Sequence, residues 1–476
     1  MTTRTLGIIG GLGALAGADL FAKLLKSPPA RADVARFHFL LEQHPFTGAG
    51  VALERGTSMT ARKLYVFQAS QSFVARRADA ILLPCFASHV FRDEIQTELE
   101  VPLLDMMAAL LRHVRQKADP GRRLGILTSD FVREAGLFER YFDDHYALLY
   151  PSPDQQTSLM QAVYGERGLQ AGDEAALEQV AQVCRHLQEQ GADLLVPGFT
   201  ELSLVAQRLQ RRGIGLLDSN AIYAEHALHY SSPALEQPFK LGIVGGVGPA
   251  ATVDFMDKVV CNTPAGCDQE HIKMVVEQNP QIPDRTANLL HEGTDPTVAL
   301  LATCQRLEAD GAKAIAIPCN TAHAFVAAIQ PYLTTPIVNM LTETIAHIRT
   351  RYSGDKPVGL LATAGTVQSR VYHAAAEQAG IRLIAPEPPF QDKVMNAIYG
   401  ECGVKAGFTE GESKTDLLAA AEHLAQAGAE ILILGCTELP LLFPQSHEIE
   451  LDGRTVALID PTDILARRCV QLARPA

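Results

Sequence analysis

The sequence of 476 residues lacks any apolar run that approaches the roughly 20 residues needed to cross a bilayer as a helix. Its start, MTTRTLGIIGGLG, has Gly-Gly where a signal peptide would have its apolar stretch, so we expect no targeting segment. These absences predict a cytoplasmic protein without a membrane partner.

A spaced cysteine framework is also missing. The nine cysteines are scattered, no CxxC or HExxH motif occurs, and Cys and His do not cluster. We therefore expect reduced thiols, no disulfides and no metal site.

The chain has no cluster of Lys and Arg either. Its formal net charge of −13 repels phosphate backbones, which argues against nucleic acid as a partner. Hydrophobic residues make up 47% and charged residues 20%, as in globular proteins. A chain of this length is too long for one ordinary core, so at least two domains are expected.

The sequence does contain an internal repeat. LGIIGGLG from Leu6 returns as LGIVGGVG from Leu241, and GADLLVPGFTE from Gly191 returns as GAEILILGCTE from Gly428. Four such segments recur in the same order at offsets of 234 to 237 residues. This constant order and spacing indicates a tandem duplication.

The two predicted units are residues 1–232 and 239–476, joined by a polar segment that contains Ser and Pro. Runs such as KLGIVGG and AEILILGC contain continuous apolar stretches of strand length, which is typical of strands covered on both faces. Amphipathic stretches that predict helices lie between these runs. The pattern predicts an α/β fold. We expect each unit to contain two doubly wound, mostly parallel sheets that face each other across a cleft, with ligands at the carboxyl ends of the strands.

Two cysteines of the second unit stand out by position. Cys319 and Cys436 each follow an apolar run and precede a segment able to start a helix, in PCNTAH and GCTELP. A thiol at the first turn of a helix lies near backbone N–H groups and the positive end of the dipole, which favour the thiolate. A lone cysteine in such a position is more often a small buried hydrophobic side chain.

The motifs of the second unit jointly resemble those of cofactor-independent aspartate/glutamate racemases. They occupy residues 245–252, 279–286, 318–323, 360–366, 399–407, 435–438 and 459–461, with the sequences GGVGPAAT, NPQIPDRT, PCNTAH, LLATAGT, YGECGVKAG, GCTE and IDP. The resemblance implies interconversion of L- and D-aspartate or glutamate, with aspartate slightly favoured. Cys319 and Cys436 would then exchange a proton across the two faces of the α-carbon.

This chemistry implies no cofactor. Cysteine bases that act directly make pyridoxal phosphate unnecessary, and the loops GGLGALAG and GGVGPAAT are not true GxGxxG fingerprints, so we expect no NAD. The expected partner is a small acidic amino acid.

The resemblance assigns Arg285 and Lys405 to the substrate carboxylates. The planar fork of an arginine can bind a carboxylate through two hydrogen bonds, and two cations suit a substrate with two carboxylates. Outside their motifs, both residues would be interpreted as solvated surface charges.

Other candidates are short polar residues. Asn320, Thr321 and Thr437 are potential donors beside the two thiols. Thr252 and Asn279 are candidate substrate contacts, although each could instead cap a helix or shape a turn.

Two neighbours of the thiols have open roles. His323 follows Cys319 by four residues and could tune the thiol, or it could be a packed or exposed histidine. Glu438 could orient Cys436 or cap the helix start that follows it.

The first unit keeps Cys85 and His89 but has lost most of the motif residues. HPFTGAGV replaces the arginine motif, and the positions of Asn320, Thr321, Lys405 and Cys436 are held by Phe86, Ala87, Gln170 and Phe199. Without a second thiol and the two cations, this unit should not racemise an acidic amino acid.

Two roles stay open for the first unit. It could supply the surface of a second subunit, as an intrachain pseudo-dimer that could form further homo-oligomers. It could instead hold a regulatory pocket lined by Phe86 and Phe199 for a less polar ligand, with Glu54, Arg55 and Arg92 rebuilding a polar site.

Alternatives to racemisation also stay open. A related isomerase that uses both thiols, a one-cysteine decarboxylase, and a non-catalytic amino-acid-binding protein share parts of this pattern. The retained pair Cys319 and Cys436 argues against one-cysteine chemistry.

Overall fold

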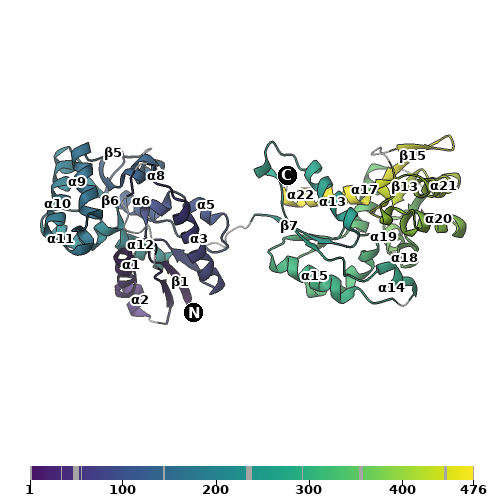
Figure 1. The fold of residues 1–476 in the computed structure, drawn as a ribbon, viewed down its shortest axis with the longest axis horizontal. Coiled ribbons are helices and arrows are strands. Elements are labelled where there is room, and N and C mark those ends of the chain that lie inside the picture. Colours follow the sequence, from purple (N-terminus) through teal and green to yellow (C-terminus); the bar gives the residue numbers. More distant parts are fainter. Residues whose placement is uncertain are drawn as a thin grey trace. The chain divides into compact units, whose positions relative to one another are not determined.

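The computed structural model describes residues 3–33, 35–44, 46, 53–54, 56–142, 145–231, 238–291, 293–352, 357–443 and 448–474. The chain forms two compact units, Met1–Gln237 and Pro238–Ala476, whose elements are labelled in Figure 1. Each unit contains two separate sheets with helices between the strands, so the predicted α/β fold is confirmed. No helix within the described ranges is both long and apolar enough to span a membrane.

The first unit has two three-stranded parallel sheets with equivalent strand orders, β2-β1-β3 and β5-β4-β6. The strands are β1 (Arg4–Ile9), β2 (Phe37–Glu42), β3 (Ala80–Leu82), β4 (Arg123–Thr128), β5 (Ala147–Leu149) and β6 (Leu194–Gly198). The α-helices are α1 (Ala14–Lys26), α2 (Pro28–Ala32), α3 (Thr60–Ala75), α4 (Phe86–His89), α5 (Arg92–Gln96), α6 (Met106–Lys117), α7 (Asp130–Glu134), α8 (Leu137–Phe142), α9 (Pro153–Tyr164), α10 (Glu174–Glu189), α11 (Ala206–Arg211) and α12 (Ser219–His229). Two 3-10 helices complete the unit, η1 (Leu169–Ala171) and η2 (Thr200–Leu204).

The second unit has a four-stranded sheet, β10-β9-β7-β8, and a five-stranded sheet, β12-β11-β13-β15-β14. The strands are β7 (Lys240–Gly245), β8 (Lys273–Gln278), β9 (Ala314–Ala316), β10 (Ile337–Val338), β11 (Val358–Leu361), β12 (Leu383–Ile384), β13 (Ile431–Leu434), β14 (Glu448–Leu451) and β15 (Arg454–Ile459). The β14–β15 pairing is antiparallel, and the other strand pairs of both sheets are parallel.

The helices of the second unit follow most of its strands. The α-helices are α13 (Pro249–Asn262), α14 (Arg285–His291), α15 (Thr297–Ala309), α16 (Val326–Ile329), α17 (Met340–Arg351), α18 (Ala364–Gln368), α19 (Val371–Ala379), α20 (Pro388–Tyr399), α21 (Glu412–Gln426) and α22 (Pro461–Ala473). The 3-10 helices are η3 (Asp268–Glu270), η4 (Thr321–Phe325), η5 (Gln330–Tyr332), η6 (Val404–Ala406) and η7 (Leu439–Leu441).

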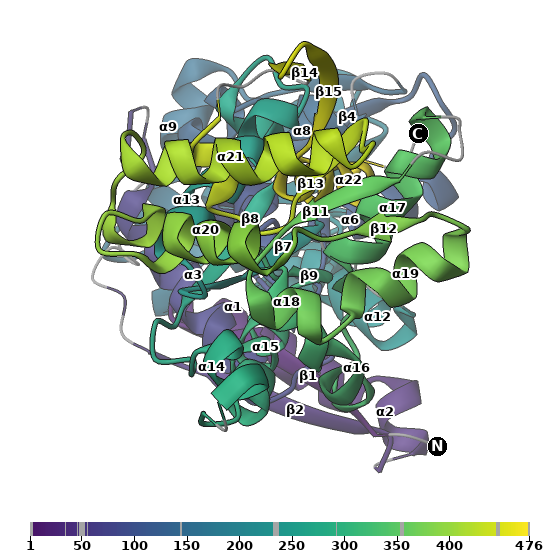
Figure 2. The same cartoon turned by 90° about the vertical axis from the view of Figure 1, so that its right-hand side faces the viewer.

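Strand β13 shows why the strands are apolar throughout. Leu432 and Leu434 pack into a core that includes Leu424 of α21, and α20 and α21 lie side by side in Figure 2. The intervening Ile433 packs into a different core with Ile345 of α17. Successive side chains of a strand point to opposite faces, so both faces of this sheet are covered.

The strand order determines where a ligand can bind. In each of the four sheets, the second strand in sequence lies on one side of the first and the third strand lies on the other. An open parallel sheet binds ligands outside the carboxyl ends of its strands at such a reversal of order. In the second unit, the segments after β7 and β9 and those after β11 and β13 occupy these positions.

The repeat extends to partly buried ion pairs. Lys23 of α1 bonds Asp19 at 2.6 Å and Asp218, before α12, at 2.8 Å. In the second unit, Lys258 of α13 likewise bonds Asp254, and Asp460, before α22, at 2.7 Å. This triad ties the first and last helices of each unit together, so we assign it a structural role.

Candidate active site

The two predicted cysteines lie in one pocket. Cys319 follows β9 and Cys436 follows β13, so the two sheets of the second unit contribute one thiol each. Both side chains are buried, with 7% and 6% of their surface exposed. The pocket is lined by Val247, Arg285, Thr286, Cys319, Asn320, Thr321, Thr363, Tyr399, Lys405, Cys436, Thr437 and Glu438.

The pocket is closed around little free space. Its cavity volume is about 10 Å³, roughly that of a single water-sized sphere. An amino acid is several times larger, so binding requires the surrounding side chains to move apart.

The helix starts beside the thiols differ from the expected α-helices. Cys319 precedes η4, a 3-10 helix of five residues, and Cys436 precedes η7, a 3-10 helix of three residues. So short a helix has little macrodipole, and its hydrogen bonds are less well aligned. The predicted stabilisation of the thiolates by helix dipoles therefore has little support here.

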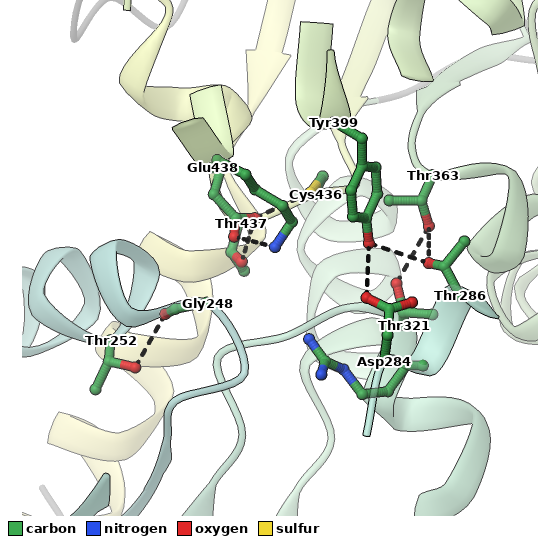
Figure 3. A network of polar contacts seen from close by, with 12 residues as sticks. Gly248, Thr252, Asp284, Thr286, Thr321, Thr363, Tyr399, Cys436, Thr437 and Glu438 are labelled. Carbon is green, nitrogen blue, oxygen red and sulfur yellow. Dashed lines mark hydrogen bonds and ion pairs between the residues drawn. The ribbon is translucent and has the colours of Figure 1, made fainter. Parts of the chain in front are cut away.

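Cys436 lies against a buried carboxylate. Its thiol donates to Glu438 Oε2 at 3.0 Å, and Thr437 Oγ1 donates to the same oxygen at 3.2 Å (Figure 3). Burial and the negative charge of Glu438 raise the pKa of Cys436 well above its ordinary value, although Lys405 acts in the opposite direction. The resting form of Cys436 is therefore the protonated thiol, which can act as a proton donor.

Glu438 bridges this thiol and a predicted substrate cation. Lys405 Nζ donates to Glu438 Oε1 at 2.7 Å. Burial opposes the charge on Glu438, but the lysine and the donors around the carboxylate keep its pKa below the ordinary value. Its side chain makes no capping bond to η7, so the structure favours the predicted role of orienting Cys436 over the role of a cap.

Arg285 begins α14 and lies beside Cys319. Burial opposes its charge, but the nearby Cys319 and Asp284 raise the pKa of the guanidinium. Its Nη1 donates to the carbonyls of Ile282 at 3.3 Å and Pro283 at 3.1 Å. The guanidinium Nε is buried and has no hydrogen-bond partner among the described residues, so it is a donor available to a bound carboxylate.

Asn320 has a similar unused donor. Its Oδ1 accepts from the Tyr372 hydroxyl at 2.6 Å, which fixes the orientation of the amide. The buried Nδ2 has no partner in the described part of the chain. A ligand oxygen in the pocket would satisfy it.

Threonine hydroxyls connect the two sides of the pocket. Thr321, which follows β9, bonds Thr363 at 3.2 Å and Thr366 at 2.8 Å, and both of these follow β11. Thr286 of α14 also donates to Thr363, at 3.4 Å. Figure 3 shows three of these threonines, Thr286, Thr321 and Thr363, grouped beside Tyr399. The network accounts for the closed state of the pocket.

Two predicted substrate contacts lie outside the pocket lining. Thr252 Oγ1 donates to the Gly248 carbonyl at 3.1 Å and accepts from the Gly246 N–H at 3.3 Å. Asn279 Nδ2 donates to Thr303 Oγ1 at 3.1 Å. These bonds support the alternative interpretation, in which both residues shape the backbone at the strand ends.

His323 is a structural clamp. Its Nε2 accepts the backbone N–H of Met340 at 3.1 Å, so Nδ1 carries the proton and donates to the Cys319 carbonyl at 2.9 Å. Burial lowers the pKa of the ring, which is therefore neutral. In the first unit, His89 makes the same two bonds, both at 3.0 Å, to Cys85 and Met106.

Tyr399 and Gly248 lie at the site but were not among the residues predicted from the sequence. The hydroxyl of Tyr399 lies 3.3 Å from Asp284 Oδ2, and burial raises its pKa to about 12. Gly248 has φ of 116°, and a Cβ there would lie 2.5 Å from Glu438 Oε1. Both residues belong to quoted motifs, but their roles depend on contacts across the pocket that spacing does not reveal.

The first unit differs from expectation at its cysteine. The first unit lacks the PDRT arginine, but Arg62 of α3, which was not among the residues predicted from the sequence, places Nη1 at 3.6 Å from Cys85 Sγ. Two of the three residues proposed as replacements do not line this pocket. Arg92 bonds the Leu103 carbonyl and Asp93, Glu54 lines a separate surface hollow, and Arg55 lies outside the described residues.

A metal centre finds no support in the residues that the structure describes. Among them, no three His, Cys, Asp or Glu side chains are grouped so that they could hold an ion.

Comparison with known proteins identifies the family of both units. The pattern of the family described as Asp/Glu/Hydantoin racemase matches residues 9–227 and again residues 244–469. A broad specificity amino-acid racemase of Bacillus subtilis is 32% identical over 150 residues, which are 30% of this chain and 63% of that protein. A glutamate racemase of Ectopseudomonas mendocina is 34% identical over 173 residues, 35% of this chain and 61% of that protein.

These two alignments span less than two thirds of the relatives' length. Among solved structures, the aspartate racemase of Picrophilus torridus is 29% identical, with 49% of this chain and 94% of that chain covered and a TM-score of 0.42. The family pattern, by contrast, covers nearly all of each unit. The chain therefore belongs to the Asp/Glu/Hydantoin racemase family, which it contains twice in tandem.

Proposed function

We propose that the second unit is a cofactor-independent racemase that interconverts L- and D-aspartate, or glutamate. The observation that carries the proposal is the placement of Cys319 and Cys436 in one closed pocket together with the cations Arg285 and Lys405. The names of relatives in this family, which include aspartate and glutamate racemases, agree with this chemistry.

The proposed reaction is a proton exchange between two thiols. One cysteine, as thiolate, removes the α-proton, and the other, as thiol, delivers a proton to the opposite face. In one direction Cys436 is suited to deliver, because burial and Glu438 keep it protonated. Each turnover leaves the cysteine that delivered its proton as the thiolate and the other cysteine as the thiol. The two cysteines exchange roles in the reverse direction.

Substrate recognition is proposed to use the unpaired donors of the pocket. The buried Nε of Arg285 and the Nδ2 of Asn320 would bind carboxylate oxygens. Lys405 would bind the second carboxylate of the substrate. That carboxylate would either share the lysine with Glu438 or displace Glu438 from it. Removal of water from so small a pocket would strengthen these contacts as charge develops in the transition state.

The decisive experiment follows the circular dichroism of L- and D-aspartate and of both glutamates in heavy water. We expect the signal to decay to zero with deuterium at the α-carbon for the full chain, and not for Cys319→Ser or Cys436→Ser. Cys261→Ser, at an exposed thiol of α13, is the matched control and should act as the wild type. If all four substrates keep their optical activity with the wild type, the racemase proposal fails and an isomerase or a binding protein takes its place.

A further inference from the structure

The first unit has a pocket at the position of the active site of the second. It lies after β3 and β6, and the residues used below, Arg62, Cys85, Phe86, Phe199 and Glu201, all line it. Its cavity volume is about 30 Å³, compared with about 10 Å³ around Cys319 and Cys436. Both volumes are far smaller than an amino acid, so in each unit a ligand can bind only if the lining side chains move apart.

A cation has been supplied to this pocket from a new element. Arg62 belongs to α3, the helix before β3, whereas Arg285 belongs to α14. Between β2 and α3, the described residues contain no counterpart of α14. The Arg62 side chain is 5% exposed, stacks over the Phe46 ring at 5.0 Å and reaches Cys85 Sγ at 3.6 Å. A buried guanidinium at a strand end is suited to bind a carboxylate.

The first unit keeps a glutamate at the position of Glu438 but has lost the lysine that pairs with it in the second unit. Glu201 takes the place of Glu438, while Gln170 takes the place of Lys405 and is exposed, outside the pocket lining. Burial raises the pKa of Glu201, opposed weakly by Thr200 and Arg62. Glu201 shares the pocket with Arg62, whose charge acts on it, but it has lost the lysine that bonds Glu438 in the second unit. A ligand ammonium group would take the place of that lysine.

The remaining wall has become apolar. Phe199 replaces Cys436 and is 3% exposed, and Phe86 replaces Asn320 and is 2% exposed. The Tyr164 ring packs edge-on against Phe199, with centroids 5.9 Å apart. The phenyl rings stand where the second unit has a proton donor and an amide, so the pocket favours an aliphatic or aromatic group at that side.

We propose that the first unit binds an α-amino acid with an apolar side chain and does not invert it. The carboxylate of the ligand pairs with Arg62, the ammonium group pairs with Glu201, and the side chain lies against Phe86 and Phe199. The one cation, one anion and apolar wall of the first unit match a zwitterion with a hydrocarbon side chain. The two cations of the second unit match a dicarboxylate instead. Cys85 has no second thiol across the pocket, so the α-proton is not exchanged between faces.

Calorimetric titration of the full chain with L- and D-alanine, valine, leucine and phenylalanine tests this proposal. We expect millimolar or tighter binding of at least one of them, and a loss of affinity of about tenfold or more in Glu201→Gln, which is nearly isosteric. Arg62→Lys should weaken binding less than Arg62→Gln, because it keeps the charge. Arg285→Gln, in the second unit, is the matched control and should bind the apolar ligand as the wild type does.

A second variant separates ligand recognition from a folding defect. Phe199→Ala removes a phenyl ring from the apolar wall and enlarges the cavity, so it should shift the preference towards leucine or phenylalanine relative to alanine, by about tenfold. The proposal is overturned if no apolar amino acid binds the full chain, or if Arg285→Gln abolishes the binding. It is also overturned if aspartate binding in the Arg285→Gln chain depends on Arg62 and Glu201, since the first unit would then bind acidic ligands.

Discussion

The two units share the backbone framework that forms the pocket and differ in the side chains that line it. Both keep the strand order, the histidine clamp after the cysteine and the Lys–Asp triad between the terminal helices. Cys436 and Lys405 of the second unit correspond to Phe199 and Gln170 of the first. The first unit has therefore retained the fold without the thiol and the lysine of the second unit. This is possible because backbone positions and pocket side chains are stabilised by different interactions.

The replacement of Cys436 by Phe199 shows how the fold can be kept while a catalytic side chain is lost. Its ring packs into a core with residues such as Leu177 and Leu202, so it contributes to burial as well as to the pocket wall. Cys436 also belongs to a core, yet its thiol is bonded to Glu438. In the first unit, a phenyl ring thus supplies apolar contact area where the second unit has a proton donor.

The largest expected effect comes from making the second unit resemble the first. Cys436→Phe removes one of the two proton carriers, and we expect racemisation to fall by about 10³-fold or more. Adding Phe199→Cys to this variant should not restore activity, because the first unit still lacks a counterpart of Lys405. The polarimetric rate with aspartate measures both outcomes. Restored activity in the double variant would show that the second thiol alone distinguishes the units.

Removing the cations should have the next largest effect. Arg285→Gln and Lys405→Gln each remove a charge-assisted hydrogen bond of about 1.5–3 kcal/mol, so kcat/KM for aspartate should fall about 10- to 100-fold. Lys405→Gln also reproduces the residue found at position 170. An unchanged KM with either variant would contradict direct binding of the carboxylates.

Glu438→Gln should change the pH dependence of one thiol. Burial and the charge of Glu438 hold the pKa of Cys436 above its ordinary value, so the neutral amide should allow the thiolate to form at lower pH. We expect alkylation of Cys436 by iodoacetamide to begin at lower pH in the variant, as followed by mass spectrometry of the labelled peptide. The exposed thiol of Cys261 is the internal control and should label with an unchanged pH profile.

Much of the fold follows from the sequence, because the repeat and the strand-length apolar runs reflect burial that acts locally. The pair Cys319 and Cys436 follows from motif position, since each cysteine comes after the carboxyl end of a strand, one in each sheet of the second unit. Arg62 could not be predicted in this way. Its contact with Cys85 depends on the packing of α3 against β1 and α4, and a helix interior carries no motif for the direction of one side chain. The roles of Thr252 and Asn279 also required backbone geometry.

The smallest difference between the units is expected at the histidine clamps. His323 and His89 are both buried and neutral, and burial lowers the pKa of each below the ordinary 6.5. A histidine that is protonated only after unfolding stabilises the folded state above pH of about 6.5, and this contribution decreases as the pH falls below that value. His323→Gln and His89→Gln should each cost about 1–3 kcal/mol, since a backbone N–H and a carbonyl lose their partners. Calorimetric unfolding between pH 5 and 8 should show similar losses in both variants, because both clamps make the same two bonds. A much larger loss of activity than of stability in His323→Gln would contradict the structural role and would indicate that the ring acts on Cys319 directly.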